Sequence, residues 1–459
     1  MRRVKLQDNQ AAEAAEWTAR AVHEAGGRAL LVGGCVRDAH LGRAAKDADM
    51  EAFGVDPRRL IELLKTRFSV DLVGEAFCVV KIRGLPLDVS VPRRESKSGL
   101  GHKGFTATAD PTLSFEEAAS RRDFTMNAMG FDLLTGEVLD PFGGGGDLDR
   151  RILRHVSYRF AEDPLRVLRG AQFAARFRLN ADPATIQLCR SMTMEGLAKE
   201  RIFDEWKKLI LLGERPSMGL DFLRRVGWTR YFPELEALID TPQDPEWHPE
   251  GDVWTHTLHC MDAFAKERIG CEREDLVVGL GVLCHDFGKP ASTVFERGRW
   301  RSPGHDVQGE KLTRRFVQRL SNQKGLAKEA AALTRWHMVP AQLEPGVSDA
   351  AVRRLSRRAG RLDRLLRVCA ADMNGRPPLP KTGQTELAWL KKRAAELNAL
   401  DSQPNPILLG RHAIQELDME PGPKIGHLLK EAYEAQLDGA FDTLETGLEW
   451  LRAKGRLEQ

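Results

Sequence analysis

The chain has 459 residues, of which 42% are hydrophobic and 29% are charged, and its formal net charge is only +3. Such a length suggests about three compact domains, and the composition is ordinary for a folded soluble protein. The overall charge gives no indication of a nucleic-acid-binding chain. Because no stretch approaches about 20 consecutive apolar residues, we expect no transmembrane helix and no membrane partner.

The cysteines and the N-terminus both favour a cytoplasmic protein. Seven cysteines are scattered through the chain, and no two of them form a Cys-x-x-Cys pair. Such a set is typical of reduced thiols, and not of a disulfide framework or a zinc ribbon. The opening residues lack the apolar core of a signal peptide, so we expect no export.

The N-terminal part alternates between helical and strand patterns. Apolar periodicity predicts helices over residues 10–25 and 57–68 and strands over residues 28–32, 77–82, 87–91 and 137–140. After Asp147 the strand signals nearly disappear, and helical periodicity extends over residues 164–177, 184–191, 200–212 and 218–226. With proline-rich breaks at 241–245 and 376–380, we predict four domains: a head (1–146), a helical neck (147–240), a helical module (241–375) and a C-terminal tail (376–459).

Two aspartates in the head are spaced for metal binding. In Lys46-Asp47-Ala48-Asp49-Met50 the carboxylates stand at positions i and i+2, which project from one face of a strand. Converging carboxylates are what a hard cation such as Mg²⁺ requires, and a pair of such ions can promote an in-line displacement at phosphorus. The pattern alone is weak evidence, because most such pairs are polar loop residues.

A glycine turn precedes these acids. Leu31-Val32-Gly33-Gly34-Cys35-Val36-Arg37-Asp38 has the pattern of a strand, a turn and a helix start. Glycines let backbone N–H groups approach phosphate oxygens closely, and Arg37 can add a fork-like phosphate contact. Taken alone, the segment is explained equally by an ordinary tight turn between strand and helix.

Three ordered motifs together resemble a known family. Gly33-Gly34-x-Val36-Arg37-Asp38, followed by Leu41-Gly42-Arg43 and Asp47-x-Asp49, resembles the head of class II tRNA nucleotidyltransferases and bacterial poly(A) polymerases, within the polymerase beta superfamily. The segments 121–129 and 162–166 resemble two further motifs of this family. The resemblance implies an α+β fold. A polymerase-beta-type head of a small mixed sheet and helices is followed by three all-α domains: a neck, a phosphohydrolase domain of the type called HD, and a tail.

The resemblance assigns catalytic roles in the head. Asp47 and Asp49 are expected to hold catalytic Mg²⁺. Asp88 stands where the family has a third acid, which serves as general base for the RNA 3′ hydroxyl or as an outer metal ligand. The alternative for Asp88 is an ion pair with Arg93.

The nucleotide-binding residues implied by the resemblance are Gly34, Arg37, Arg122, Asp163, Arg166 and Arg169. Gly34 and Arg37 are expected to face the triphosphate, and Arg122 to contact the nucleotide. Asp163 and Arg166 are expected to share a helix face, where their acceptors and donors match the Watson–Crick edge of cytosine or adenine, with Arg169 adding a phosphate or base contact. The alternative is an intrahelical salt bridge worth a few tenths of a kcal/mol.

The glycine-containing basic segment 94–106 resembles the flexible loop that the family uses when specificity changes from C to A. Its presence favours complete C-C-A addition or A addition over addition of C alone.

A second group of residues predicts a metal site of another kind. The candidate ligands are His256, His285, Asp286 and Asp372, with His305 and His337 as further histidines. Their order resembles the metal-dependent phosphohydrolase domain named HD after its His-Asp pair. Imidazole with carboxylate suits Ni²⁺, Mn²⁺ or Fe²⁺, and Mg²⁺ is also possible. The resemblance implies phosphatase and 2′,3′-cyclic phosphodiesterase activities, and a purely structural role of these histidines is the alternative.

Residues 352–369 have an amphipathic helical pattern. The positions expected to face a core are Leu355, Ala359, Leu362 and Leu366, and those expected outside are Arg353, Arg357, Arg358, Arg361 and Arg364. This arginine face is interpreted as contacting the RNA backbone or shielding the helix that carries Asp372, and simple solvation is an equally good interpretation.

The expected activity is transfer of C, C and A from CTP and ATP to the 3′ end of tRNA, with pyrophosphate release. An A-adding enzyme or a poly(A) polymerase shares the same head and stays an alternative. An HD hydrolase with a non-catalytic RNA-binding head is disfavoured, because the head acids and arginines are all present. Both a monomer and a homodimer remain open.

Overall fold

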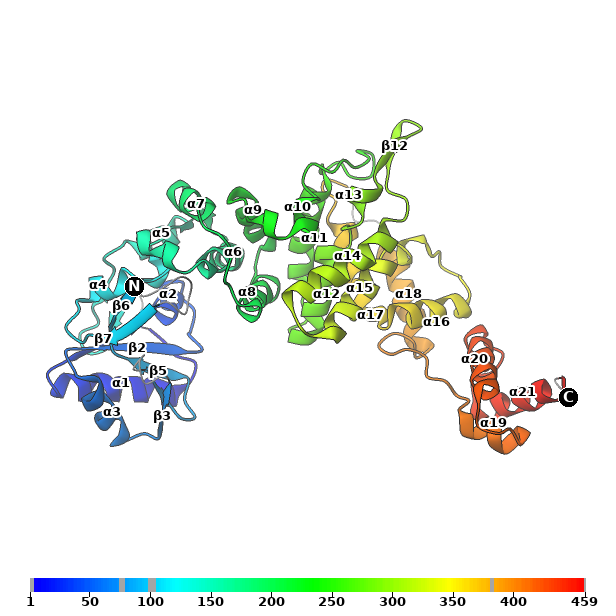
Figure 1. Ribbon diagram of the computed structural model, residues 1–459, viewed down its shortest axis with the longest axis horizontal. Helices are drawn as coiled ribbons and strands as arrows, with labels where there is room; N and C mark the ends of the chain where they lie inside the picture. Colours follow the sequence, from blue (N-terminus) through cyan, green and yellow to red (C-terminus); the bar gives the residue numbers. More distant parts are fainter. Residues whose placement is uncertain (1–3, 74–78, 98–104, 380–383, 458–459) are drawn as a thin grey trace. The chain divides into compact units, whose positions relative to one another are not determined.

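A computed structural model describes residues 4–73, 79–97, 105–379 and 384–457 of the chain (Figure 1). The chain divides into two compact units, Met1–Tyr231 and Phe232–Gln459. The first unit contains a mixed sheet followed by helices, and the second is almost wholly helical. The finer division into four domains stays a prediction.

The main sheet of the first unit has seven strands in the order β3-β4-β5-β2-β1-β8-β9. They are β1 (Arg28–Val32), β2 (Ala48–Phe53), β3 (Val70–Val73), β4 (Val79–Ile82), β5 (Leu87–Ser90), β8 (Gly130–Asp132) and β9 (Val138–Leu139). Strand β1 is antiparallel to β2 and β8, whereas β2 and β5 are parallel. The strand predicted over 28–32 is confirmed at both ends, and its apolar side chains are buried.

Five helices belong to the same part of the chain: α1 (Asn9–Glu24), α2 (Gly34–His40), α3 (Pro57–Lys65), α4 (Phe115–Ala119) and α5 (Gly144–Asp149). Helix α1 begins after Asp8, whose carboxylate accepts a hydrogen bond from the N–H of Ala11 at 3.0 Å. A separate pair of strands, β6 (Arg93–Lys97) and β7 (Phe105–Ala109), flanks the predicted specificity loop. The loop was predicted over 94–106, but its residues 94–97 and 105–106 belong to these strands; the rest, 98–104, lies outside the described residues.

The helices predicted for the neck are confirmed as α6 (Leu165–Phe177), α7 (Pro183–Arg190), α8 (Lys199–Leu212) and α9 (Pro216–Arg225). Short elements accompany them: β10 (Ile152–Leu153), β11 (Asn180–Ala181), and the 3₁₀ turns Thr125–Asn127, Tyr158–Glu162 and Trp228–Tyr231. Helices α6 and α9 approach closely at Gly219, where an added Cβ would lie 2.5 Å from the carbonyl oxygen of Ala171. This contact holds α6, which carries predicted site residues, in a fixed position.

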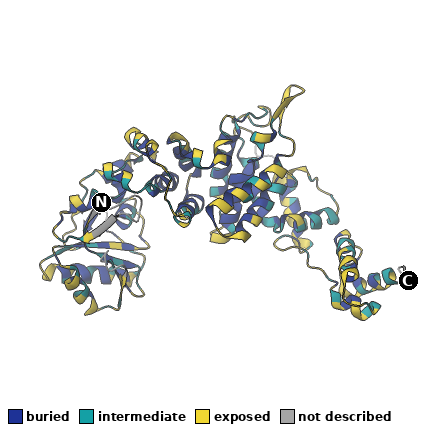
Figure 2. Cartoon of the chain, viewed as in Figure 1, coloured by how far each residue is buried: buried dark blue, intermediate teal, exposed yellow. Residues whose placement is uncertain are grey.

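The second unit is built on helices α10 (Pro233–Glu236), α11 (Val253–Lys266), α12 (Glu272–Cys284), α13 (Lys289–Ser292), α14 (His305–Leu320), α15 (Lys324–Trp336), α16 (Asp349–Ala359) and α17 (Leu362–Asn374). It also has the 3₁₀ turn Pro340–Gln342 and a hairpin of β12 (Val294–Glu296) and β13 (Arg299–Arg301). Helix α12 is buried from Asp275 to Cys284, so it forms the centre of this bundle (Figure 2). A helix apolar on every side is typical of such a central position.

The prediction of a single amphipathic helix over residues 352–369 is wrong in two respects. The segment forms two helices, α16 and α17, because the backbone at Gly360 takes a φ of +83° and ends the first of them. Arg364, expected outside, is buried. Its guanidinium donates to Glu274 at 2.6 and 2.7 Å and to Glu329 at 2.7 Å, so paired acids replace the water that an exposed arginine would have.

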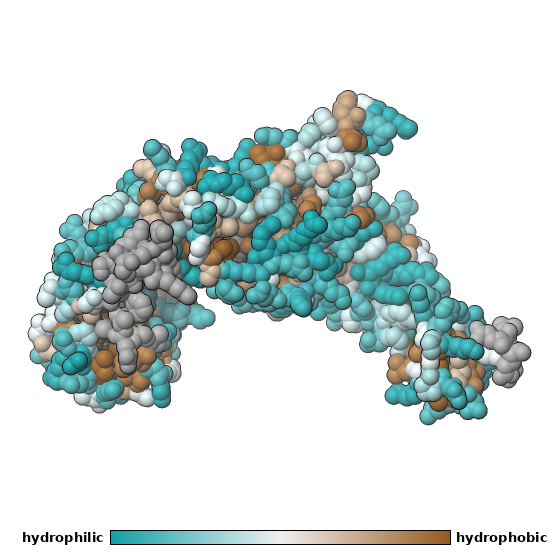
Figure 3. All heavy atoms as spheres, viewed as in Figure 1, coloured by the Kyte–Doolittle hydropathy of each residue, from teal (hydrophilic) through white to brown (hydrophobic). Residues whose placement is uncertain are grey.

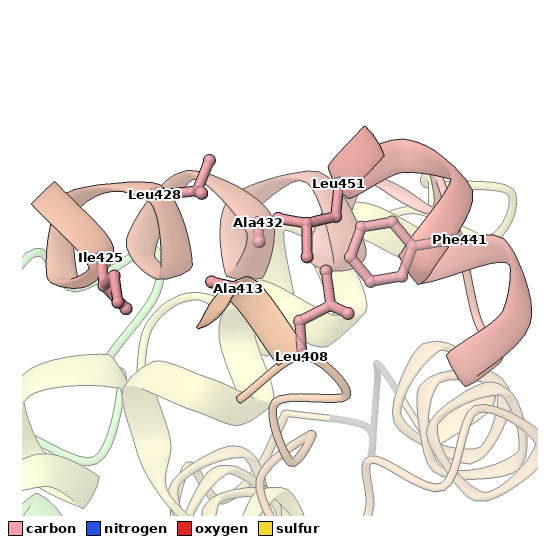
Figure 4. Close-up of a cluster of buried hydrophobic side chains, with 7 residues drawn as sticks. All are labelled: Leu408, Ala413, Ile425, Leu428, Ala432, Phe441 and Leu451. Carbon is pink, nitrogen blue, oxygen red and sulfur yellow. The ribbon is translucent and has the colours of Figure 1, made fainter. Parts of the chain in front are cut away.

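The tail has four helices: α18 (Gln384–Glu396), α19 (Gly410–Leu417), α20 (Pro423–Asp438) and α21 (Leu444–Leu457). The last three pack around a small apolar cluster of Leu408, Ala413, Ile425, Leu428, Ala432, Phe441 and Leu451 (Figure 4). Arg357 of the predicted arginine face pairs with Glu434 of α20, and Arg354, which was not assigned to that face, pairs with Asp438 of the same helix. Part of that face is therefore used inside the protein.

Among the described residues, no helix is both long enough and apolar enough to cross a membrane.

Candidate functional site

A cavity of about 970 Å³ lies in the first unit, between the glycine turn, the strand β2 acids and helix α6. It is lined by eight of the predicted site residues, namely Gly34, Arg37, Asp47, Asp49, Arg122, Asp163, Arg166 and Arg169. The ninth, Asp88, lines an adjoining cavity of about 420 Å³, which shares Asp49, Arg122 and Arg166 with the first. The fold thus brings together acids and cations that lie up to 132 positions apart in the sequence, from Arg37 to Arg169.

The three acids of the head are neighbours on adjacent strands. Asp49 pairs in register with Asp88 of the parallel strand β5, so both side chains project from the same face of the sheet. Asp47 lies just before β2, two residues from Asp49, and lines the same cavity. Loss of water raises the pKa of Asp49, and although Arg122 opposes this, the charges of Asp88 and Asp47 raise the pKa further. Such an excess of negative charge fits a divalent cation.

Asp88 has a cationic partner that was not considered from the sequence. Its carboxylate lies 3.1 Å from Lys81 Nζ on the neighbouring strand β4, where the two residues are in register. The alternative of an ion pair with Arg93 stays a prediction. Lys81 is half exposed, so its attraction for Asp88 is screened by water and leaves the carboxylate available.

The glycine turn packs against the cavity arginines. Gly33 has a φ of +75°, and an added Cβ would lie 2.8 Å from Arg122 Nη1. Arg37, in the first turn of α2, is buried and donates to Asn127 Oδ1 at 2.7 Å and to Asp38 Oδ1 at 2.8 and 2.9 Å. Its guanidinium is therefore held at a fixed point of the cavity wall. Contact of Arg37 with a triphosphate stays a prediction.

Asp163 and Arg166 do not share a helix face as predicted. Asp163 is extended, with φ −125° and ψ 103°, and lies before α6, because Pro164 disfavours a helical conformation in the residue that precedes it. Its carboxylate accepts from the N–H of Leu165 at 3.1 Å and pairs with Arg201 at 2.9 Å. Arg166 donates to the carbonyl oxygens of residues 159 and 121 at 2.7 and 2.8 Å. The alternative of an intrahelical salt bridge between the two is therefore also wrong, and both side chains are fixed by other groups.

Asp123 lies in the cavity but was not predicted as a site residue, although it belongs to the motif 121–129. It is buried, lines the cavity, and pairs with Arg169 at 2.6 Å. Burial opposes ionisation, but Arg169 and Asn127 hold the pKa of Asp123 below its usual range. Asp123 is therefore a carboxylate that fixes Arg169, and the contact of Arg169 with phosphate or base stays a prediction.

The second predicted site is a compact cluster in the second unit, where the ends of several helices meet. His256 belongs to α11 and Asp372 to α17, and their side chains lie 3.1 Å apart, measured from Nε2 to Oδ1. His285 directly follows α12, and its Nε2 atom lies 3.3 Å from His256 Nε2. Asp286 Oδ2 lies 3.2 Å from His285 Nε2. All four side chains are buried, so the sequence prediction of their proximity is confirmed.

Asp286 also faces a second pair of histidines. Its Oδ1 atom lies 3.7 Å from His305 Nε2 and 4.0 Å from His337 Nε2, and these two nitrogens are 3.4 Å apart. The Oδ2 atom is buried and makes no hydrogen bond with any described residue, although Lys289 Nζ lies 2.8 Å away. A buried carboxylate oxygen that accepts no hydrogen bond from the described residues fits a cation bound between the two pairs of histidines.

The outer nitrogens of the histidines are held by acceptors. His285, His305 and His337 each place Nδ1 at 2.7–2.8 Å from a backbone carbonyl, and His256 places Nδ1 2.8 Å from Glu250 Oε1. An N–H donated outward leaves the lone pair on Nε2, and the Nε2 atoms are those that converge. Imidazoles oriented in this way could hold a metal ion, and a purely structural role would not require this orientation.

Electrostatics favour the ligand-competent forms of His337, Asp286 and Asp372. In His256, burial opposes the charged form, but Cys260 and Asp372 raise the pKa well above its ordinary value. Burial lowers the pKa of His337 to about 3, so its imidazole is neutral at physiological pH. Burial opposes the ionisation of Asp286, but His285 and Lys289 hold its pKa well below the usual range. Arg376 has the same effect on the pKa of Asp372. Neutral imidazoles and ionised carboxylates are the forms that bind a divalent metal.

Three neighbours of the cluster were not predicted as site residues. Cys260 Sγ lies 3.3 Å from His256 Nε2, and Glu250 lies between His256 and His248, whose Nδ1 is 2.9 Å from Glu250 Oε1. The spacing of four residues between His256 and Cys260 places both on one face of a helix, which is a signal the sequence contains. His248 and Glu250 lie in an irregular segment, where no periodicity could locate them.

Gly288 is required by the close packing of this cluster. An added Cβ would lie 1.9 Å from the carbonyl oxygen of His305 and 2.8 Å from the N of Gly309, both backbone atoms. We expect Gly288→Ala to lower the free energy of unfolding by about 1–3 kcal/mol through overpacking. Gly426→Ala in α20 is the matched control, since it meets no heavy atom within 4 Å and should slightly stabilise the helix. Equal melting temperatures of the two variants would contradict the packing argument.

Comparison with known proteins identifies the family. Residues 29–154 match the family described as the poly A polymerase head domain. The multifunctional CCA protein of Xanthomonas campestris pv. campestris (strain B100) is 35% identical over 420 residues, which cover 88% of this chain and 96% of that protein. The chain belongs to the family of multifunctional CCA proteins. The family member of Xylella fastidiosa (strain M23) is 36% identical over 365 residues, which cover 76% of this chain and 84% of that protein.

Solved structures show the same fold. The CCA-adding enzyme of Bacillus stearothermophilus in complex with CTP aligns over 98% of this chain and 99% of its own, with a TM-score of 0.69 at 22% identity. The CCA-adding enzyme of Thermotoga maritima complexed with tRNA aligns over 97% and 96%, with a TM-score of 0.60 at 20% identity. The predicted fold class and family are both confirmed.

Proposed function

We propose that the chain adds C, C and A to the 3′ end of tRNA from CTP and ATP, with release of pyrophosphate. One observation carries the proposal: the head cavity joins the acids Asp47, Asp49 and Asp88 to the side chains at the start of α6, in a chain related over most of its length to multifunctional CCA proteins. Acids that can hold a cation and a separate group of base-facing side chains are the two components that such a reaction needs.

In the proposed transfer, the RNA 3′ oxygen forms a bond with the α-phosphorus of the nucleotide. The bond from that phosphorus to its bridging oxygen breaks, and pyrophosphate leaves. Asp88 accepts the proton of the 3′ hydroxyl, for which its position beside Asp49 is suitable. Asp47 and Asp49 would hold Mg²⁺, which supplies charge neutralisation at the phosphates when it is bound. Arg122 adds a fixed positive charge on the same cavity wall.

Nucleotide selection is assigned to Asp163 and Arg166. Each is held in one orientation by neighbours, Asp163 by Arg201 and the N–H of Leu165, and Arg166 by two backbone carbonyls. Side chains that are fixed before the ligand arrives lose little entropy on binding, which suits a protein template for a base edge. The carboxylate supplies acceptors and the guanidinium supplies donors, the combination that cytosine and adenine require.

Asp163→Ala tests this assignment. We expect the preference for CTP over UTP to fall about 10-fold to 100-fold, because one or two hydrogen bonds to the base are lost. The exposed acid Asp204, on α8, provides the matched control Asp204→Ala. Single-nucleotide addition with each nucleotide alone measures the ratio of kcat/KM values. An unchanged ratio in Asp163→Ala, with activity retained, would remove Asp163 from the selection of the base.

For the second site we propose a metal-dependent phosphohydrolase that acts on 2′,3′-cyclic phosphates and phosphomonoesters. His256, His285, Asp286 and Asp372 would hold one divalent cation. Asp286 with His305 and His337 would hold another, with Ni²⁺, Mn²⁺ and Mg²⁺ as the candidates. In the reaction a water oxygen bonds to phosphorus and one ester bond from phosphorus to oxygen breaks. Lys289 and Arg376, which line the cavity over this cluster, are placed to neutralise the phosphate.

A second candidate function for the head is addition of A alone or of a poly(A) tail. It is favoured by the family match of residues 29–154, which is named after poly A polymerase. The head acids serve either reaction equally, so the two functions differ only in the nucleotides and RNA ends that the protein accepts.

A further inference from the structure

The β12–β13 hairpin is exposed throughout and carries apolar side chains. Phe295 and Trp300 are cross-strand partners whose rings lie 5.0 Å apart at 62°, and they are 61% and 36% exposed. In Figure 1 the hairpin labelled β12 projects from the helices of its unit, and Figure 3 shows brown spheres beside teal ones at this place. A two-stranded hairpin has no core of its own, so exposed aromatic rings on it are typical of a binding surface.

The charge of the hairpin points to an anionic ligand. Its eight residues, 294–301, contain Arg297, Arg299 and Arg301 against the single acid Glu296. Aromatic rings interleaved with arginines are the combination that binds nucleotides, since the rings stack on bases and the guanidinium groups contact phosphates.

The hairpin also forms one wall of the cavity over the HD cluster. This cavity, of about 630 Å³, is lined by Asp286, His305 and Asp372 on one side and by Trp300 and Arg301 of the hairpin on another. Its volume lies in the range of small-ligand sites, about 300–1,000 Å³. The aromatic surface and the metal cluster therefore belong to one pocket.

A second indole and an ion pair extend this wall. Trp247, which is 55% exposed, lines the same cavity. Its neighbour Glu246 pairs with Arg299 of the hairpin at 3.1 Å, which links the hairpin to the segment that carries Trp247. The pocket therefore has an aromatic part, formed by the two indoles, and a phosphate-binding part at the HD cluster.

We propose that this pocket binds a nucleotide, free or at the 3′ end of RNA, with its base stacked on Trp300 and its terminal phosphate at the HD cluster. The proposal rests on the proposed phosphohydrolase function and names a specificity-determining residue, Trp300, for it. Arg299 and Arg301 face the remaining phosphates of an RNA strand. A phosphoester without a base fills only the phosphate-binding part of the pocket and is bound less tightly.

The test uses the full chain with Mn²⁺ and compares 2′,3′-cyclic AMP with anhydroerythritol cyclic phosphate, which has the sugar-like ring but no base. We expect Trp300→Ala to raise the KM for 2′,3′-cyclic AMP about 10-fold to 100-fold with little change in kcat, and to leave the KM for the baseless compound unchanged. Trp300→Phe should restore most of the affinity. Val294→Ala, on the same hairpin but outside the cavity lining, is the matched control.

Direct binding separates this proposal from the function on which it rests. Calorimetry measures the Kd of adenosine 2′-phosphate for the wild type and Trp300→Ala, whether or not either protein turns over substrate. An equal Kd, or equal KM values for both cyclic phosphates in both proteins, would overturn the stacking proposal while leaving the phosphohydrolase intact. Absence of hydrolysis in the wild type with a weaker Kd in Trp300→Ala would overturn the phosphohydrolase and support the nucleotide pocket. A lower KM for an RNA oligonucleotide ending in a cyclic phosphate than for 2′,3′-cyclic AMP would assign the pocket to RNA ends, and equal values to free nucleotides.

Discussion

Asp49→Asn is expected to lower the kcat of nucleotide addition to tRNA by about 10³-fold or more, which corresponds to about 4 kcal/mol of transition-state stabilisation. Asp49 is the central acid of the head, since it lies in register with Asp88 and two residues from Asp47. An amide of the same shape keeps the packing but removes the negative charge that holds a divalent cation. Binding of CTP should weaken much less, because the arginines of the cavity remain.

The measurement is single-turnover incorporation of labelled CTP into a tRNA that lacks its terminal nucleotides. Asp71→Asn provides the matched control, since Asp71 lies on β3 of the same sheet and pairs with the exposed Arg83. Retained binding of CTP reports whether the first unit of Asp49→Asn is folded, since the site lies in that unit. Retention of a tenth or more of the wild-type rate by Asp49→Asn would contradict the assignment of the acids.

His285→Ala is expected to abolish hydrolysis of 2′,3′-cyclic phosphates while leaving C-C-A addition intact. The imidazole lies within 3.3 Å of both His256 and Asp286, so its loss removes a ligand from the middle of the cluster. A divalent metal in the cluster then has one ligand fewer, so its affinity should fall by about 10-fold or more. Even the loss of a residue that only hydrogen-bonds to a metal ligand has an effect of this order.

Metal content and phosphodiesterase turnover measure this effect together. His427→Ala is the matched control, because His427 is a largely exposed histidine of the same unit, distant in sequence from the cluster. Equal turnover by His285→Ala and the wild type would mean that the cluster is not the catalytic site. Loss of C-C-A addition in His285→Ala would mean that the two activities are not separable.

The parts of the molecule that were predicted correctly depend on local pattern. The strand Arg28–Val32 is apolar at every position after the first, and the glycines that follow it end the strand sharply. The helices of the neck have strong periodicity, and the order of motifs identified the family. These features follow from neighbouring residues, so the sequence contains them directly.

The parts that were missed depend on contacts between distant segments. Arg364 looked like a solvated residue, but Glu274 and Glu329, at least 35 positions away, bury it through ion pairs. Asp163 was placed on a helix because its spacing from Arg166 is helical, whereas Pro164 keeps it extended. Asp123 and Glu250 act by holding other side chains, and a role of that kind is visible only once the partner's position is known.

The central claim, complete C-C-A addition, is tested most directly with tRNAs that lack the last one, two or three nucleotides of the 3′ end. Each is incubated with CTP alone, with ATP alone and with both. The account predicts that CTP alone extends the two shorter tRNAs up to the second C, that ATP alone extends only the tRNA lacking its final A, and that both together complete all three. Addition of A only to the longest tRNA, or synthesis of long A tails, would contradict it.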